Sequence, residues 1–158
     1  MEDIRRLNST APWEPIFGYV RAVKAGDWLL ISGTTSFDAQ GVVVGRGQAY
    51  TQARQAIENI ESVLERAGMA LSNVVRTRIF LTDIGDFEAI ARAHREFFAT
   101  NPPAATVVEV RRLVHPDMMI EIEADAYAGV GSGDTRAQGP SRPAVQTKRG
   151  GRRSRARN

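Results

Sequence analysis

The sequence predicts one domain of the α+β class, built from a six-stranded, mainly antiparallel sheet with two helices on one face. Two patterns support this prediction: apolar residues alternate with polar ones in several short runs, and they recur every three or four residues in two longer runs. A chain of 158 residues, 42% of them hydrophobic, is long enough for one compact core and too short for two ordinary domains.

Turn residues define the first predicted elements. The stretch around Trp13 is poor in apolar residues and predicts a loop or an irregular edge. Two short apolar runs, 19–25 and 28–32, flank a Gly-Asp pair, which is typical of a β-hairpin. Because side chains alternate along a strand, Tyr19 and Arg21 are expected on the same face.

The middle of the chain predicts two further strands and both helices. Short runs at 42–44 and 74–81 are expected to be strands. Stretches at about 48–67 and 86–98 each carry one apolar stripe at helical spacing, and Gly68 is well placed to end the first helix. Two helices cover only one face of such a sheet, so the other face needs solvent or another partner.

The last two strands flank a loop at His115-Pro116-Asp117 and are expected to form a hairpin. In the final strand, the predicted core face carries Ile120, Ile122, Ala124 and Ala126. The opposite face carries three carboxylates, those of Glu121, Glu123 and Asp125. Like charges in a row repel one another, so this face must meet solvent, a cationic partner or a binding site.

Several short motifs follow one another in a recognisable order. They are Gly18-Tyr19-Val20, Ile31-Ser32-Gly33, Gln52-Ala53, Asn59-Ile60, Asp86-Phe87, Phe97-Phe98, Pro103-Ala104-Ala105-Thr106, Val108-Glu109-Val110 and Ile120-Glu121-Ile122-Glu123-Ala124. Over roughly residues 15–128 the chain thus resembles the YjgF/RidA family of reactive-intermediate (imine) deaminases. The resemblance implies a RidA-like (chorismate-mutase-like) fold and a homotrimer whose three sheets form a central barrel. It also implies that a small-molecule ligand binds in clefts between subunits.

The resemblance also assigns roles to particular residues. It implies that Glu121 is the catalytic acid that positions or activates water, and that Tyr19, Ser32 and Gly33 line the substrate-binding cleft. The residues themselves allow a second interpretation, in which Glu121 pairs with an arginine of the sheet and Tyr19 is an ordinary half-buried aromatic. The arginines available for such a pair are Arg76, Arg78 and Arg111.

One position departs from the family. Family members that hydrolyse imines have an arginine directly after the Pro-Ala of the signature, where it holds the substrate carboxylate, whereas this chain has Ala105. Arg21 and Arg111 are candidates to replace that arginine, and Arg21 is favoured because it shares a face with Tyr19. A solvated surface arginine is the alternative for both. Thr106 offers a hydroxyl for substrate binding beside the alanine.

No sequence signal indicates a metal or another cofactor. The chain has no cysteine and two histidines, which rules out thiolate chemistry and a multi-histidine zinc site. His94 lies on the apolar stripe of the second helix, where a boundary histidine and a catalytic one are the two interpretations. His115 has no identifiable partner in the sequence.

The C-terminal segment differs from the rest of the chain. We predict a RidA-like domain at 1–130 and a disordered basic tail at 131–158, because the tail has no apolar periodicity. The tail has eight Arg or Lys and one Asp, a charge of +7, so the remainder carries 3 − 7 = −4. Nonspecific nucleic-acid binding and a simple solvated extension are both open. No apolar run could span a membrane, so a cytoplasmic protein is expected.

Two functional hypotheses follow for the domain, and a third for the tail. The first is a RidA-like hydrolase that converts an enamine or imine to a carbonyl compound and ammonia, with a substrate other than the simple 2-imino acids because of Ala105. The second is a noncatalytic small-ligand-binding trimer on the same scaffold. The third is a nucleic-acid-associated protein, supported by the basic tail alone.

Overall fold

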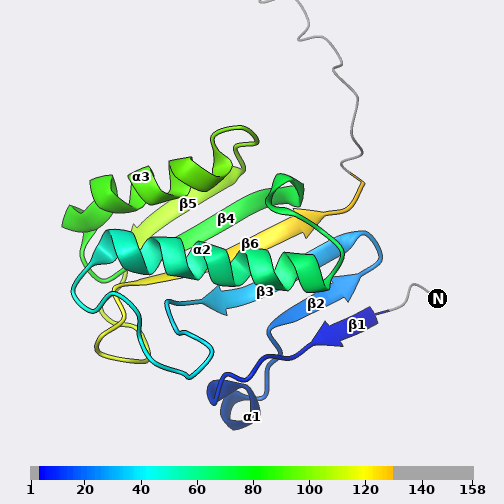
Figure 1. The fold of residues 1–158 in the computed structure, drawn as a ribbon, viewed down its shortest axis with the longest axis horizontal. Coiled ribbons are helices and arrows are strands. Elements are labelled where there is room, and N and C mark those ends of the chain that lie inside the picture. The colour runs from blue at the N-terminus through cyan, green and yellow to red at the C-terminus, as the bar shows by residue number, and fades with distance from the viewer. Residues whose placement is uncertain (1–3, 130–158) are drawn as a thin grey trace, which may run out of the picture.

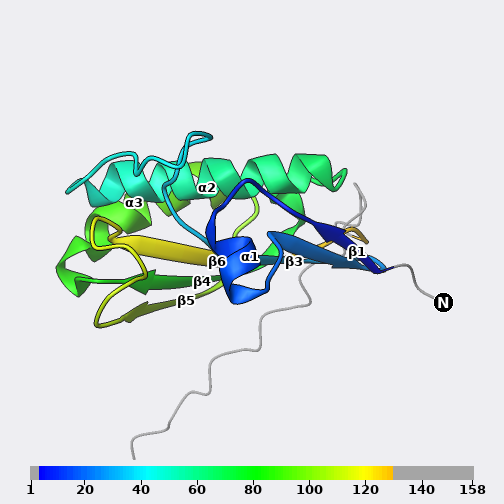
Figure 2. The same cartoon turned by 90° about the horizontal axis from the view of Figure 1, so that it is seen from below.

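The computed structural model describes residues 4–129. Its single sheet has the strand order β1-β2-β3-β6-β4-β5, and α2 and α3 lie together on one face of it (Figures 1 and 2). The strands are β1 (Ile4–Leu7), β2 (Ala22–Ala25), β3 (Trp28–Thr34), β4 (Val74–Leu81), β5 (Ala104–Glu109) and β6 (Ile120–Tyr127). The helices are α1 (Trp13–Phe17), α2 (Ala49–Arg66) and α3 (Phe87–Phe98), with single 3-10 turns at Leu71–Asn73 and Ile84–Asp86.

The α+β class, the six-stranded sheet and the one-sided helical layer are confirmed. The hairpin of β2 and β3 also forms as predicted, with Ala25 opposite Trp28 at its turn. The predicted basic tail at 131–158 lies outside the described residues. In the described part of the chain, no helix combines the length and the apolar composition that a membrane span requires.

Two predicted strand assignments are wrong. The run 42–44 forms only an isolated bridge between Phe37 and Val43, while the unpredicted β1 pairs with β2 at the edge of the sheet. β5 and β6 do not form a hairpin, because β4 lies between them and pairs with β5 in parallel and with β6 antiparallel. The loop that contains His115 therefore crosses over the end of β4 rather than closing a two-strand turn.

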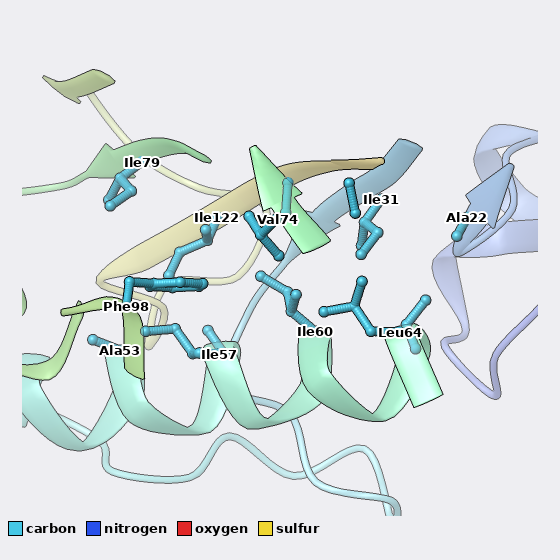
Figure 3. Packing of buried hydrophobic residues seen from close by; sticks show 14 of the residues in the cluster. Ala22, Ile31, Ala53, Ile57, Ile60, Leu64, Val74, Ile79, Phe98 and Ile122 are labelled. Carbon is cyan, nitrogen blue, oxygen red and sulfur yellow. The ribbon is translucent and has the colours of Figure 1, made fainter. Parts of the chain in front are cut away.

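The core lies between α2, α3 and the covered face of the sheet. The side chains of Ile57, Ile60 and Leu64 point from α2 toward the strands, and all three are fully buried (Figure 3). Each such side chain contributes about 1.5 to 3 kcal/mol relative to an exposed one, which is why the periodic stripe determines the helix orientation. Gly68 follows the helix with a φ of 75°, a left-handed conformation that favours glycine.

β6 alternates as predicted, and this alternation divides the sheet into two different faces. The side chains of Ile120, Ile122, Ala124 and Ala126 are fully buried under the helices. On the opposite face, Arg78 donates hydrogen bonds to Glu123 at 3.3 Å and to Asp125 at 3.2 Å. Exposed apolar side chains accompany these ion pairs on the strands, among them Trp28, Leu30 and Val108. This second face is therefore mixed in character, with both charged and large apolar groups.

Candidate ligand site

A cavity of about 930 Å³ lies between the N-terminal segment, the end of β3 and its following loop, α2 and β6. Five of the seven predicted site residues line it: Tyr19, Arg21, Ser32, Gly33 and Glu121. They come from three segments that the sheet order brings together, since β2, β3 and β6 are consecutive neighbours. The sequence motifs, which are far apart in the chain, thus meet in one place.

Glu121 is half-buried at this cavity, on the face of β6 that the helices do not cover. Burial, and next the negative charge of Glu123, raise the pKa of the Glu121 carboxyl, while Arg21 acts in the opposite direction. Within residues 4–129, Glu121 forms no ion pair with a sheet arginine: Arg76 pairs with Asp125, and Arg78 pairs with Glu123 and Asp125. Arg111, the third arginine considered for this pair, is exposed. The Glu121 carboxylate is left available to the cavity.

Arg21 is buried, so the solvated alternative for this arginine is wrong. Its Nη1 donates to the Gly33 carbonyl at 2.7 Å and to the Thr34 hydroxyl at 3.0 Å, and its Nη2 donates to the Tyr19 hydroxyl at 3.0 Å. Its Nε lies 3.8 Å from a carboxylate oxygen of Glu14. The guanidinium is thus held by the protein itself and fixes the phenol of Tyr19 at the cavity.

Glu14 belongs to the stretch around Trp13, for which the predicted loop or irregular edge is wrong, because residues 13–17 form the short helix α1. It lies in α1, is buried, and accepts hydrogen bonds from the Ser9 amide at 3.0 Å and from the Ser9 hydroxyl at 2.6 Å. Its carboxylate therefore ties the segment before α1 to the Arg21 guanidinium. No local pattern reveals this pairing, because α1 is only five residues long and its partner belongs to another segment.

Ser32 is placed at the cavity by backbone and side-chain contacts. Its amide donates to the Arg21 carbonyl at 3.0 Å, and its hydroxyl donates to the Val20 carbonyl at 2.8 Å. Oxygen lone pairs of that hydroxyl can still accept a hydrogen bond from a ligand. Ser32 therefore suits the binding of an N–H group.

The chain matches one known protein family over most of the described residues. Residues 9–128 match the sequence profile of the family described as Endoribonuclease L-PSP. This chain belongs to that family, which is the YjgF/RidA family. The resemblance found in the sequence motifs is confirmed.

Several relatives share much of their length with this YjgF/RidA chain. A RutC family protein from Pyrococcus horikoshii is 40% identical over 72% of this chain and 90% of its own length. The 3-aminoacrylate deaminase RutC of Acinetobacter baylyi is 38% identical over 72% of this chain and 89% of its own length. Coverage of the relatives is therefore nearly complete.

Solved structures agree with the YjgF/RidA fold. A YjgF-family crystal structure from Mycobacterium tuberculosis superimposes with a TM-score of 0.72 at 36% identity and covers 79% of this chain and 99% of that one. The YjgF gene product of Escherichia coli gives 0.68 at 32% identity, covering 78% and 98%. This chain therefore matches nearly the whole length of both structures.

Ala105 and Thr106 do not line the cavity formed by the described residues. They lie on β5, at the opposite edge of the sheet from β1, and β4 separates β5 from the strand of Glu121. Arg111 follows β5 and is exposed. Position 105, where the resemblance implies an arginine in imine-hydrolysing members, is therefore remote from Glu121 within one chain.

The two histidines lie outside the group of residues around Glu121. His94 contacts the Thr77 hydroxyl through Nε2 at 3.1 Å and packs against Phe98, and burial lowers the pKa of its imidazole. His115 Nδ1 accepts a hydrogen bond from the Asp117 amide at 3.2 Å. Among residues 4–129, no three acidic or histidine side chains gather in a way that could hold a metal ion.

Proposed function

We propose that this YjgF/RidA protein is a deaminase that hydrolyses an imine or enamine to a carbonyl compound and ammonia. The observation that carries the proposal is the half-buried Glu121, with its raised pKa, in a cavity that it shares with Tyr19 and Ser32. Enzymes tune a glutamate upward in this way when it must exchange protons near neutral pH. The relative named as 3-aminoacrylate deaminase supports the same class of reaction.

In the proposed reaction, Glu121 orients a water molecule toward the carbon of the C=N bond. The substrate reacts as the iminium, already protonated on nitrogen. As the new C–O bond forms, the electron pair of the C=N π bond moves to nitrogen and Glu121 accepts one proton from the water, which gives a neutral carbinolamine. Glu121 then passes that proton to the nitrogen, the C–N bond breaks, and ammonia leaves as the hydroxyl oxygen forms the carbonyl and gives its proton back to Glu121. One water is consumed for each ammonia released, and an enamine enters the same path through its imine tautomer.

We also propose that the protein is a homotrimer with its cavities at subunit interfaces. The face opposite the helices carries exposed Trp28, Leu30 and Val108 beside ion pairs, and β5 is an exposed edge strand, both of which favour burial against another subunit. Such an assembly would bring Ala105 and Thr106 of one subunit to the cavity of its neighbour. Light scattering at micromolar concentration should give three times the chain mass, and a monomer mass would refute the assembly.

A steady-state assay with an imine formed in situ tests the enzymatic proposal. The Glu121→Gln variant keeps the size of the side chain and removes the proton acceptor, so the rate should fall at least about 100-fold. Glu88→Gln makes the same chemical change at an exposed residue of α3, away from the cavity, and should leave the rate unaltered. Equal rates for wild type and Glu121→Gln across a range of imines would favour the noncatalytic binder instead.

A further inference from the structure

We propose that the cavity selects an imine or enamine that carries an apolar substituent and no carboxylate. This inference rests on the proposed function and names the substrate class for the same site. Three features of the cavity lead to it: the charge of its lining, the state of its buried arginine, and the apolar side chains around it.

The charged side chains of the cavity favour a neutral or cationic ligand. Acidic groups line it at Asp38, Glu121 and Glu123, against the guanidinium groups of Arg21 and Arg66. Glu123 is paired with Arg78 and Arg21 with Glu14, which leaves the carboxylates of Asp38 and Glu121 against the guanidinium of Arg66. An imine nitrogen gains a proton readily, and the resulting iminium cation is attracted by acidic side chains. A ligand carboxylate would instead lie near the carboxylates of Glu121 and Glu123, where repulsion opposes its binding.

The buried arginine does not offer the free pair of N–H groups that binds a carboxylate well. Arg21 uses both terminal nitrogens on Gly33, Thr34 and Tyr19, and Glu14 lies beside its Nε as a buried counter-charge. Arg66 is exposed and donates from Nη2 to the Asn8 carbonyl at 2.6 Å, and an ion pair with an exposed arginine contributes little to binding because water screens it. With alanine at position 105, the family's usual anchor is absent as well. Arg21 is therefore a positioning residue for Tyr19 rather than a substitute anchor.

Large apolar side chains that the chain leaves exposed gather at the same cavity. Ile16 is 76% exposed, Phe17 is 84% exposed and Val114 is 64% exposed, and all three belong to the cavity lining. Phe37 and Met118 extend this apolar wall, and the rings of Phe17 and Tyr19 lie 6.1 Å apart. An aromatic or long alkyl substituent would remove this surface from water, which favours ligands of that kind.

A matched pair of imines tests the substrate class directly. Phenethylamine treated with an amine oxidase gives 2-phenylethanimine, and phenylalanine treated with an amino-acid oxidase gives the same skeleton with a carboxylate on the imine carbon. The full-length protein should hydrolyse the first imine with a kcat/KM at least about 10-fold higher, the effect expected of an anion that lacks a charged partner. Equal or faster hydrolysis of the carboxylate imine would overturn the inference.

Binding separates a failure of this inference from a failure of the proposed function. If neither imine is hydrolysed faster than by Glu121→Gln, the deaminase proposal fails and calorimetry decides the ligand class. Phenethylamine should then bind at least about 10-fold more tightly than phenylacetate. Tighter binding of phenylacetate, or no binding of either compound at millimolar concentration, would overturn the ligand class.

Glu14→Gln tests the role of the buried counter-charge. Removing the negative charge beside Arg21 should raise the affinity for phenylacetate about 10-fold and lower that for phenethylamine. Glu88→Gln on α3 is the matched control and should change neither affinity. An unchanged phenylacetate affinity in folded Glu14→Gln would show that Glu14 does not set the charge preference. The wild-type comparison above decides the ligand class even if this variant does not fold.

Discussion

Gly33 lies directly against the carboxylate of Glu121. A Cβ built on Gly33 would overlap Oε1 of Glu121 and would lie 2.8 Å from its Cδ and 3.1 Å from its Cγ. No Cβ fits at position 33 while the Glu121 carboxylate keeps this position, so the absence of a side chain at Gly33 allows the carboxylate to lie against β3. The glycine of the Ile31-Ser32-Gly33 motif is therefore explained by close packing between β3 and β6.

Gly33→Ala should reduce deaminase activity about 10-fold to 100-fold while leaving the fold nearly as stable. The new methyl group meets the mobile end of the Glu121 side chain, which can rotate away, and displacing a catalytic group by about 1 Å costs up to about 100-fold in rate. Thermal unfolding and kcat/KM measured on the same preparation would check this prediction.

Gly85→Ala is a suitable control for Gly33→Ala. Its Cβ would also meet a carboxylate oxygen, that of Asp83, in a milder contact at 3.0 Å and in a place that does not line the cavity. Activity should be retained in that variant. A Gly33→Ala protein with full activity would mean that the position of the Glu121 carboxylate does not limit the reaction.

Glu121→Gln should make the protein more stable at neutral pH while it abolishes activity. The pKa of Glu121 is raised in the folded protein, so folding favours the protonated acid, and this contribution is lost as pH rises through the folded pKa. Glutamine does not ionise, so the stability of the variant does not decrease at this position as pH rises. Denaturant unfolding should therefore show an advantage for Glu121→Gln at pH 7 that disappears below the ordinary pKa of glutamic acid.

The prediction is contradicted if the difference in unfolding free energy between Glu121→Gln and wild type is the same at pH 7 as at acidic pH. The pH profile of kcat/KM, which reports ionisations of the free enzyme, should agree with the stability measurement. If Glu121 works as a carboxylate, kcat/KM falls as pH drops through its raised pKa. If the acidic transition of the wild-type profile persists in Glu121→Gln, the proton transfer belongs to another group.

Sequence patterns predicted the elements that bury a regular face. Ile57, Ile60 and Leu64 recur at helical spacing, and Ile120 and Ile122 alternate, so hydrophobic burial alone determines their orientation. The strand β1 lacked such a signal because three of its four residues are exposed and it depends on backbone pairing with β2. The run 42–44 had apolar composition but no neighbouring strand to pair with beyond one bridge.

Long-range pairing also explains what the site prediction missed. Strands β5 and β6 are consecutive in sequence, but β4 lies between them in the sheet. The alternation of apolar and polar residues carries no information on such a crossover. Arg21 is buried because Gly33, Thr34 and Glu14 surround it, and these partners come from segments that meet only after folding. Family motifs located the cavity, while the contacts that neutralise Arg21 required the structure.

His94→Phe should keep activity and remove part of the stability loss at mildly acidic pH. Burial lowers the pKa of His94, so the folded protein favours neutral imidazole and loses stability as pH falls through the histidine pKa of the unfolded chain. At neutral pH the variant should lose about 1 kcal/mol, because the buried Thr77 hydroxyl loses its partner. Unfolding at pH 5 and 7.5 would check both effects, and a large loss of activity would place His94 in the reaction.

The Ala105→Arg substitution tests the assembly and the missing anchor together. Within one chain, position 105 lies on β5 and does not reach the cavity, so an introduced arginine can affect the substrate only in the cavity of a neighbouring subunit. A charge-assisted pair with a substrate carboxylate contributes about 1.5 to 3 kcal/mol, so kcat/KM for 2-imino acids should rise about 10-fold to 100-fold. The imine without a carboxylate should gain nothing.

Ala104→Arg, one residue earlier on the same exposed strand, is a matched control because strand alternation points it to the opposite face. If Ala105→Arg and Ala104→Arg change the rate on 2-imino acids equally, a general gain in positive charge explains the result. If Ala105→Arg has no effect in a protein that scatters light as a trimer, the neighbouring β5 does not reach the cavity. The carboxylate anchor would then have to be introduced in the segment before β2 or on β3, where Tyr19 and Ser32 already define the site.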